Sequence, residues 1–201
     1  MKRRSFLTTS TALAAATALP TVSPASMTAE ASMLAPWTGP YGGVPPFDRV
    51  QIAAFKAALL QAMDAQRVET AAIAGNTAAP TFENTVLALE KSGRELARVS
   101  SLFGTFTGTM NRGPMRKLQT EMTPILSAFS DEQIQNAAVF ARVKAVYDAR
   151  LSGGLSPEAQ RLTDVVYTNY VTQGAALDPA SKKQLAQINQ KLAGLDRKSV
   201  V

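Results

Sequence analysis

The chain has 201 residues, of which 46% are hydrophobic and 18% charged, a balance typical of a globular protein and not of a disordered one. It contains neither cysteine nor histidine, which excludes disulfides, thiolate nucleophiles and any metal ligand or catalytic base built on imidazole. The formal charge is +6, but basic residues cluster only near the N-terminus, and elsewhere they are scattered among acidic residues, so we expect no nucleic-acid partner.

Residues 1–31 have the three-part layout of an export signal. Lys2-Arg3-Arg4 precedes a short apolar run, and Ala29-Glu30-Ala31 offers small residues before a cleavage point, with cleavage after Ala25 as an alternative. Arg3-Arg4-Ser5-Phe6-Leu7 resembles the twin-arginine signal, which predicts a periplasmic or exported protein. A general secretory signal and a disordered tail are the other interpretations. The run is shorter than the about 20 residues of a spanning helix, so no stable membrane span is expected after signal removal.

A segment rich in proline and glycine, residues 32–48, follows the leader. Proline removes backbone donors and fixes φ, so we expect an extended, irregular arm. The aromatic residues Trp37, Tyr41 and Phe47 predict that this arm lies against the body of the protein, with a flexible spacer as the alternative.

From residue 49 to residue 195 apolar residues recur at helical spacing, which predicts an all-α fold. The best candidate for a strand is the run from Thr163 to Thr172, but helix start and stop signals flank it. The first apolar stripe consists of Ile52, Phe55, Leu59 and Met63.

A second helical segment is expected to begin at Thr81, which can cap it, after a break at residues 76–80. Its stripe runs from Phe82 to Met110, and Gly93 occupies one of the stripe positions. Glycine inside a helix lowers stability by about 1 kcal/mol, so we interpret Gly93 as a point where two helices approach closely.

Proline, glycine and capping residues mark the later helix boundaries. Gly113-Pro114 is expected to begin a helix that Pro124 kinks or splits. Ser130-Asp131-Glu132-Gln133 has the pattern of a capping box and predicts a new helix that extends to Leu151. The last two helices are expected to begin at Ser156-Pro157 and Asp178-Pro179.

The sequence contains no known catalytic or metal-binding arrangement. A His-Glu-x-x-His zinc site needs two imidazoles, and no run of carboxylates matches a calcium loop. The serines have no histidine to activate them. We therefore predict no catalytic, cofactor-binding or metal-binding residue in this chain. Tyr167 and Tyr170, near Asn169, either line a cleft or pack between helices, and packing is the favoured interpretation.

Several short blocks of sequence occur in a characteristic order. The most specific block combines Ala79-Pro80-Thr81-Phe82-Glu83-Asn84-Thr85 with Leu89-Glu90-Lys91-Ser92-Gly93. Weaker blocks lie on both sides of it, at residues 34–37, 45–47, 126–131, 140–143, 174–177 and 188–195. Their order resembles that of the thimet oligopeptidase and oligopeptidase A family of zinc metallopeptidases, and within it the bacterial peptidyl-dipeptidases. The resemblance covers about residues 33–195.

This resemblance implies the helical N-terminal lobe of a neurolysin-like fold, which forms one wall of a deep channel for short peptides. The zinc motif of the family lies much further along the chain, so we expect a non-catalytic fragment without its catalytic half. The parent enzyme would bind zinc and release C-terminal dipeptides, or act as an endopeptidase like oligopeptidase A. Residues 196–201 break the pattern and match a translated sequencing adapter, so we expect a non-native tail there. The alternative is a complete exported, all-helical module that binds peptides or proteins without catalysis.

Overall fold

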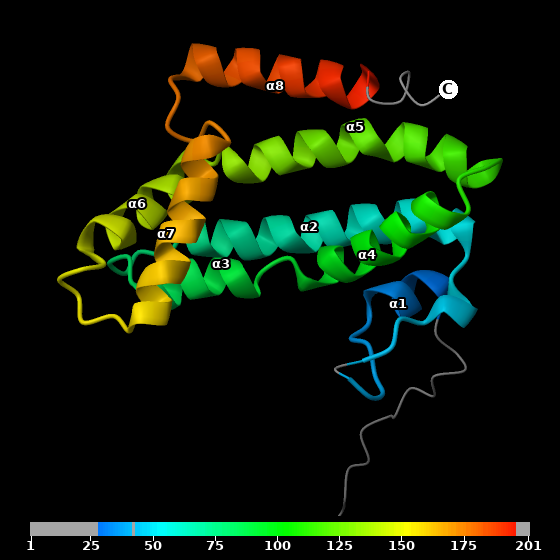
Figure 1. Ribbon diagram of the computed structural model, residues 1–201, viewed down its shortest axis with the longest axis horizontal. Coiled ribbons are helices and arrows are strands. Elements are labelled where there is room, and N and C mark those ends of the chain that lie inside the picture. The colour runs from blue at the N-terminus through cyan, green and yellow to red at the C-terminus, as the bar shows by residue number, and fades with distance from the viewer. Residues whose placement is uncertain (1–27, 42, 196–201) are drawn as a thin grey trace, which may run out of the picture.

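The computed structural model describes residues 28–41 and 43–195; most of the expected leader and the expected tail at 196–201 lie outside the described residues. The described part of the chain is mainly helical and contains no strand beyond a single bridge between Thr38 and Val44 (Figure 1). The expected all-α class is confirmed. The elements are α1 (Ala29–Leu34), η2 (Phe47–Arg49), η3 (Ile52–Ala54), α2 (Phe55–Ala74), η4 (Phe82–Val86), α3 (Leu87–Lys91), α4 (Arg94–Thr109), α5 (Pro114–Ile134), α6 (Ala137–Ala149), α7 (Pro157–Thr172) and α8 (Pro179–Leu195).

The long helices α2, α4 and α5 run side by side along the molecule (Figure 1). Helix α8 lies along the outer side of α5, and α6 and α7 pack together at one end. The short helix α1 lies at the other end, against α2 and α4. Helix α8 is therefore an outer layer whose principal neighbour is α5.

The main hydrophobic core lies between α1, α2, α4 and α5. Phe55, Leu59 and Met63 are buried on one face of α2, so the first expected stripe is a core stripe. The Phe55 ring contacts Phe103 and Phe106 edge-to-face, with ring centroids 5.5 and 5.4 Å apart. These contacts fix α4 against α2.

Helix α1 is part of this core, although the sequence pattern did not predict it. Met33 is fully buried there, and Thr28 caps the helix by accepting a hydrogen bond from the Ala31 amide at 3.2 Å. At the other end of α1, Arg98 Nε donates to the carbonyl oxygen of Leu34 at 3.1 Å. The expected boundary between leader and arm at residue 31 therefore falls inside a packed helix, and the irregular arm begins only after Leu34.

Of the three aromatic residues in the arm, only Trp37 packs against the main core. Gly43, with a φ of +118°, lies so close to it that an added Cβ would be 2.7 Å from the Trp37 Cβ. Tyr41 is fully exposed at the tip of the Thr38–Val44 turn, and Phe47 is half exposed. Trp37 is thus the aromatic anchor of the arm.

Gly93 separates α3 from α4, so the second helical segment is divided where an unbroken helix was expected. Its φ of +68° is left-handed, a conformation that glycine adopts without the steric penalty of a side chain. Its amide donates to Glu69 Oε2 of α2 at 2.6 Å, and an added Cβ would lie 2.7 Å from the Gln66 side chain. The expected close approach is confirmed, but it brings a helix break, not a helix interior, against α2.

The expected cap at Thr81 is confirmed. Thr81 Oγ1 accepts from the Asn84 amide at 3.2 Å, and Asn84 Oδ1 accepts from the Thr81 amide at 2.8 Å. The buried Arg142 of α6 also donates to Asn84 Oδ1, at 2.9 Å. The same guanidinium donates to the carbonyl oxygens of Asn76 and Ala78 at 2.7 and 3.1 Å, and so ties the break between α2 and η4 to α6.

Helix α5 continues from Pro114 to Ile134, so it is not split at Pro124 and no new helix begins at Ser130. The buried residues Met122 and Phe129 lie on either side of Pro124, and their burial outweighs the local preference for a break. The expected capping box is therefore wrong.

Asn136 supplies the cap of α6 instead. Its Oδ1 accepts from the amides of Ala138 and Val139, both at 3.1 Å. The remaining expected helix starts are confirmed, because Pro114 and Pro157 occupy first turns and Asp178 accepts from the amides at the start of α8.

Candidate functional site

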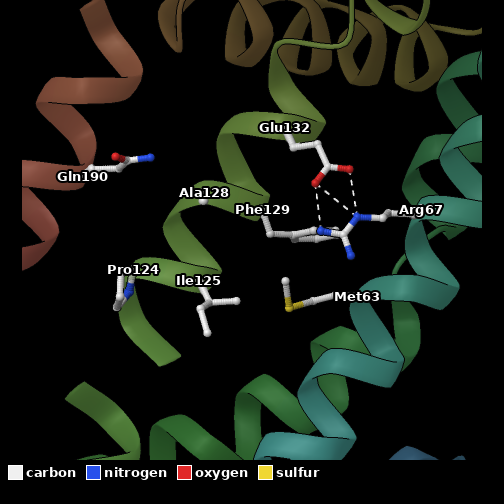
Figure 2. A pocket seen from close by; sticks show the side chains of 8 residues that line it. All are labelled: Met63, Arg67, Pro124, Ile125, Ala128, Phe129, Glu132 and Gln190. Carbon is white, nitrogen blue, oxygen red and sulfur yellow. Dashed lines mark hydrogen bonds and ion pairs between the residues drawn. The ribbon is translucent and has the colours of Figure 1, made fainter. Parts of the chain in front are cut away.

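The candidate site is an open groove of about 470 Å³ between α2, α5 and α8 (Figure 2). It lies where α8 packs on α5 while α2 packs on the other side of α5. The lining residues are Met63 and Arg67 from α2, Pro124, Ile125, Ala128, Phe129 and Glu132 from α5, and Gln190 from α8. Most of the lining is apolar, and one end carries a pair of opposite charges.

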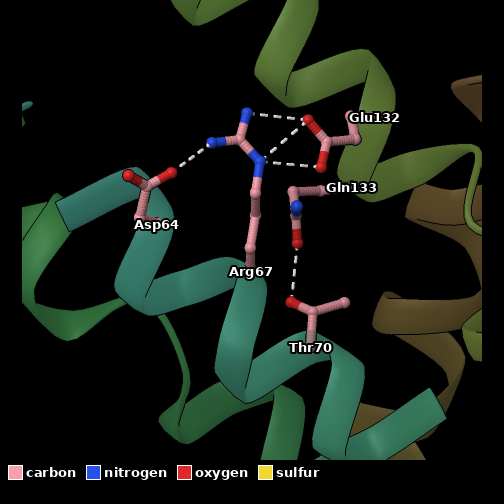
Figure 3. A network of polar contacts seen from close by, with 5 residues as sticks. All are labelled: Asp64, Arg67, Thr70, Glu132 and Gln133. Carbon is pink, nitrogen blue, oxygen red and sulfur yellow. Dashed lines mark hydrogen bonds and ion pairs between the residues drawn. The ribbon is translucent and has the colours of Figure 1, made fainter. Parts of the chain in front are cut away.

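Arg67 is held at that end by two acidic residues (Figure 3). Its Nε donates to Glu132 Oε1 and Oε2 at 2.9 and 3.1 Å, and a terminal nitrogen donates to Oε2 at 2.8 Å. The other terminal nitrogen donates to Asp64 Oδ1 at 2.7 Å. The guanidinium carbon also lies 4.9 Å from the centre of the Phe129 ring, so the charge sits over an aromatic face.

These contacts decide what the charged end of the groove can bind. The hydrogen bond with Glu132 is the largest cause that raises the pKa of Arg67 above its ordinary value, so the guanidinium stays protonated. A carboxylate ligand would have to displace Glu132 from a bidentate pair to reach Arg67. The groove is therefore suited to an apolar side chain lying beside a fixed ion pair, and its lining contains no nucleophile paired with a base.

A smaller, more polar pocket of about 210 Å³ lies between α2, α3, α5 and α7. Thr70 and Gln133 line it, and the Thr70 hydroxyl donates to Gln133 Oε1 at 2.6 Å (Figure 3). Asn169 and Tyr170 line the same pocket. Burial raises the pKa of Tyr170 to about 12, so its phenol is neutral throughout the physiological range.

Tyr167 and Tyr170 pack between helices, as the favoured interpretation expected. The Tyr167 ring stacks on Tyr147 of α6 with centroids 3.8 Å apart. Phe140 of α6 stacks against Tyr167 and Tyr170 at 6.0 and 6.2 Å. Tyr170 combines the two interpretations, because one part of it packs on α6 and another part lines the smaller pocket.

No metal centre forms among the residues that the structure describes. Within residues 28–41 and 43–195, no three acidic, histidine or cysteine side chains gather closely enough to hold a metal ion. The whole sequence also lacks histidine and cysteine, so these residues do not fit a zinc ion of the kind that the resemblance implies. In the same ranges no helix is both long enough and apolar enough to cross a bilayer.

Arg67 and Glu132 define the charged end of the groove, and the sequence analysis did not find them. They are 65 positions apart, so no local motif joins them. The nearest signal was the polar segment at residues 130–133, which was interpreted as a helix cap. Inside α5 the same segment presents Glu132 and Gln133 to α2, where they contact Arg67 and Thr70.

The fold and the groove define an all-helical scaffold with an open, mainly apolar groove. No protein-family model matches the chain. The chain is similar to the dipeptidyl carboxypeptidases of Salmonella typhimurium (strain LT2) and Escherichia coli (strain K12), with 38% and 36% identity over 151 residues. The expected resemblance to the peptidyl-dipeptidases is confirmed.

The matched 151 residues are 75% of this chain but only 22% of each relative. The chain therefore spans about a fifth of the length of these relatives.

Proposed function

We propose that the chain forms the non-catalytic N-terminal lobe of a zinc-dependent peptidyl-dipeptidase that releases dipeptides from the C-termini of short peptides. The similarity to two dipeptidyl carboxypeptidases over 75% of the chain is the observation that carries this proposal. The order of short sequence blocks from residue 33 to residue 195 is consistent with it.

The zinc ion of the proposed enzyme would be held by residues outside this chain. Imidazole and thiolate are absent from all 201 positions, and the described carboxylates do not cluster. When bound, zinc would polarise the scissile carbonyl and activate water. The part of this chain is to shape the peptide channel, and the apolar groove between α2, α5 and α8 is its candidate contact with peptide side chains.

The proposed enzyme is exported through a twin-arginine signal, because Arg3 and Arg4 precede Phe6-Leu7 and a mildly apolar run. We place the cleavage point after Ala25, with Ser23 and Ala25 as the small residues that the signal peptidase requires. A cut after Ala31 would remove the Thr28 cap and half of α1 from the core.

A chimera tests the proposal. The part of the Salmonella typhimurium relative that corresponds to residues 28–195 of this chain is replaced by those residues, and dipeptide release from an N-terminally blocked peptide is measured. We expect the chimera to be active and the isolated chain to be inactive, with or without added zinc. Cleavage by the isolated chain that a chelator abolishes and zinc restores would contradict the proposal.

The groove also supports a second candidate function, an exported helical module that binds peptides without catalysis. Its apolar lining includes Ile125, which is partly exposed and accessible to a partner side chain, beside the buried side chains of Met63 and Phe129. The two functions predict different behaviour of the purified chain. A lobe separated from its enzyme should aggregate or lack fixed tertiary packing, because apolar surface is left in water. A soluble monomer with a sharp, cooperative melting transition would favour the binding module.

A further inference from the structure

A second apolar surface runs along α8 and is separate from the groove. We call it the α8 ridge and define it by Leu177, Leu185, Ile188 and Leu192. The first two side chains meet over Gly174, where an added Cβ would lie 2.9 Å from Leu177 Cδ1 and 2.5 Å from Leu185 Cδ2. The next two follow at steps of three and four residues, so the ridge is one continuous strip.

Three of the four ridge residues are exposed and Leu185 is half-buried, although the spacing from Leu185 to Leu192 is that of a core stripe. Leu177, Ile188 and Leu192 are 42%, 53% and 56% exposed. Helix α8 makes its polar contact with α5 through Asn189, whose Nδ2 donates to Asp131 Oδ1 at 2.8 Å. Leu185 and Leu192 are four and three residues away from Asn189, so the ridge borders the α5 contact, and its exposed residues Ile188 and Leu192 extend beyond that contact into solvent. A helical stripe of large apolar residues left in water marks a surface that another element covers.

Two features identify the chemistry of the covering element. The ridge has the width of a single helix stripe, which fits the apolar face of another helix. Helix α8 carries Lys182, Lys183 and Lys191 and no acidic residue. A partner helix with carboxylates beside its apolar face is complementary to this charge.

We infer that the α8 ridge is the docking surface for an acidic, amphipathic helix of the catalytic part of the peptidase. This inference rests on the proposed function. The matched region is only 22% of each relative, so most of such an enzyme lies outside it and is available to cover the ridge. Val68 at 70% and Leu151 at 74% are also strongly exposed, but they lie on α2 and after α6 and are not part of the ridge.

The chimera described above also tests this inference, through side-chain protection. In the chimera, hydroxyl-radical labelling read by mass spectrometry should modify Ile188 and Leu192 about fivefold less than Val68 and Leu151, because a half-exposed residue becomes a core residue. The paired variant Ile188→Gln with Leu192→Gln should lower the melting midpoint of the chimera, because the ridge would lose its apolar contact with the docked helix. The matched pair Val68→Gln with Leu151→Gln should leave the midpoint unchanged.

Co-expression supplies the same comparison if fusion prevents folding. The full chain and the unmatched remainder of the Salmonella typhimurium relative are expressed as two polypeptides. The Ile188→Gln/Leu192→Gln variant (the ridge pair) should abolish their co-purification, whereas the Val68→Gln/Leu151→Gln variant (the control pair) should retain it. Equal labelling at all four positions, or equal effects of the two pairs, would overturn the inference. A dimer of the full chain that the ridge pair dissolves would also overturn it, because a second copy would then be the occupant.

These results separate the inference from the proposed function. An active chimera with an unprotected ridge refutes the docking surface alone. A folded chimera with a protected ridge but no dipeptide release refutes the proposed function and leaves the docking surface intact.

Discussion

At the scale of single residues, Arg142 joins segments of the chain that no local sequence pattern links. It is buried and donates to two carbonyl oxygens in the break after α2 and to Asn84, which itself caps η4. Each acceptor is neutral, so the guanidinium acts through hydrogen bonds and not through an ion pair.

Replacing Arg142 should therefore destabilise the fold. We expect Arg142→Met to lower the free energy of unfolding by about 2–3 kcal/mol, since buried acceptors lose their donors. Arg161→Met is the matched control, because Arg161 is exposed on α7, and it should change stability little. Urea denaturation of the chimera measures both; equal effects of the two substitutions would show that the hydrogen bonds contribute nothing.

The buried phenol of Tyr170 should make the folded protein less stable in strong alkali. Burial raises its pKa from 10.0 to about 12 in the folded chain, so the unfolded chain loses this proton first as the pH rises. The contribution is fully present below pH 10 and disappears between pH 10 and about 12, by up to about 2–3 kcal/mol. Tyr170→Phe should remove this part of the pH dependence, whereas Tyr41→Phe at a fully exposed position should retain it. Denaturation curves across this pH range distinguish the two outcomes.

At the scale of helices, Asn136 and Ser130 offer a direct comparison between a real cap and an apparent one. Asn136→Ala should lower stability by about 1 kcal/mol, because two amides at the start of α6 lose their acceptor. Ser130→Ala should be neutral or slightly stabilising, because Ser130 is exposed inside α5 and alanine favours a helix interior. Thermal melts of the chimera would contradict the structure if Ser130→Ala were the more damaging change.

The helices after residue 49 could be predicted, because their periodicity and their Pro, Ser and Asp start signals are local, whereas α1 lies in a segment without such a pattern. The positions of two boundaries could not. At Gly93 the apolar stripe continues across a residue with a left-handed backbone conformation, so the spacing of apolar residues alone does not reveal the helix break. At residues 130–136 two capping patterns compete, and burial of Phe129 on α5 decides between them. The Arg67–Glu132 pair joins helices 65 positions apart, and only the tertiary packing brings its atoms together.

At the scale of the whole molecule, the core begins earlier in the chain than the leader prediction allowed. Because α1 is packed against α2 and α4, a mature protein that keeps this helix and its cap begins no later than Thr28. We expect N-terminal sequencing of the exported protein to begin at Ser26, after cleavage behind Ala25. Ala25→Arg should block processing and Ala31→Arg should permit it. A mature chain beginning at Ser32 would contradict this prediction.

The position of Trp37 makes it an intrinsic fluorescence probe of the N-terminal segment. It is the single tryptophan of the sequence, its indole nitrogen is shielded from solvent, and it packs on the cluster that contains α1. Release of the N-terminal segment from the body would expose this indole to water and move its fluorescence emission to longer wavelength. Intrinsic fluorescence of the unlabelled protein should therefore report whether α1 is packed on the core. It should do so separately from the unfolding of α6 and α7, because those helices contain no tryptophan.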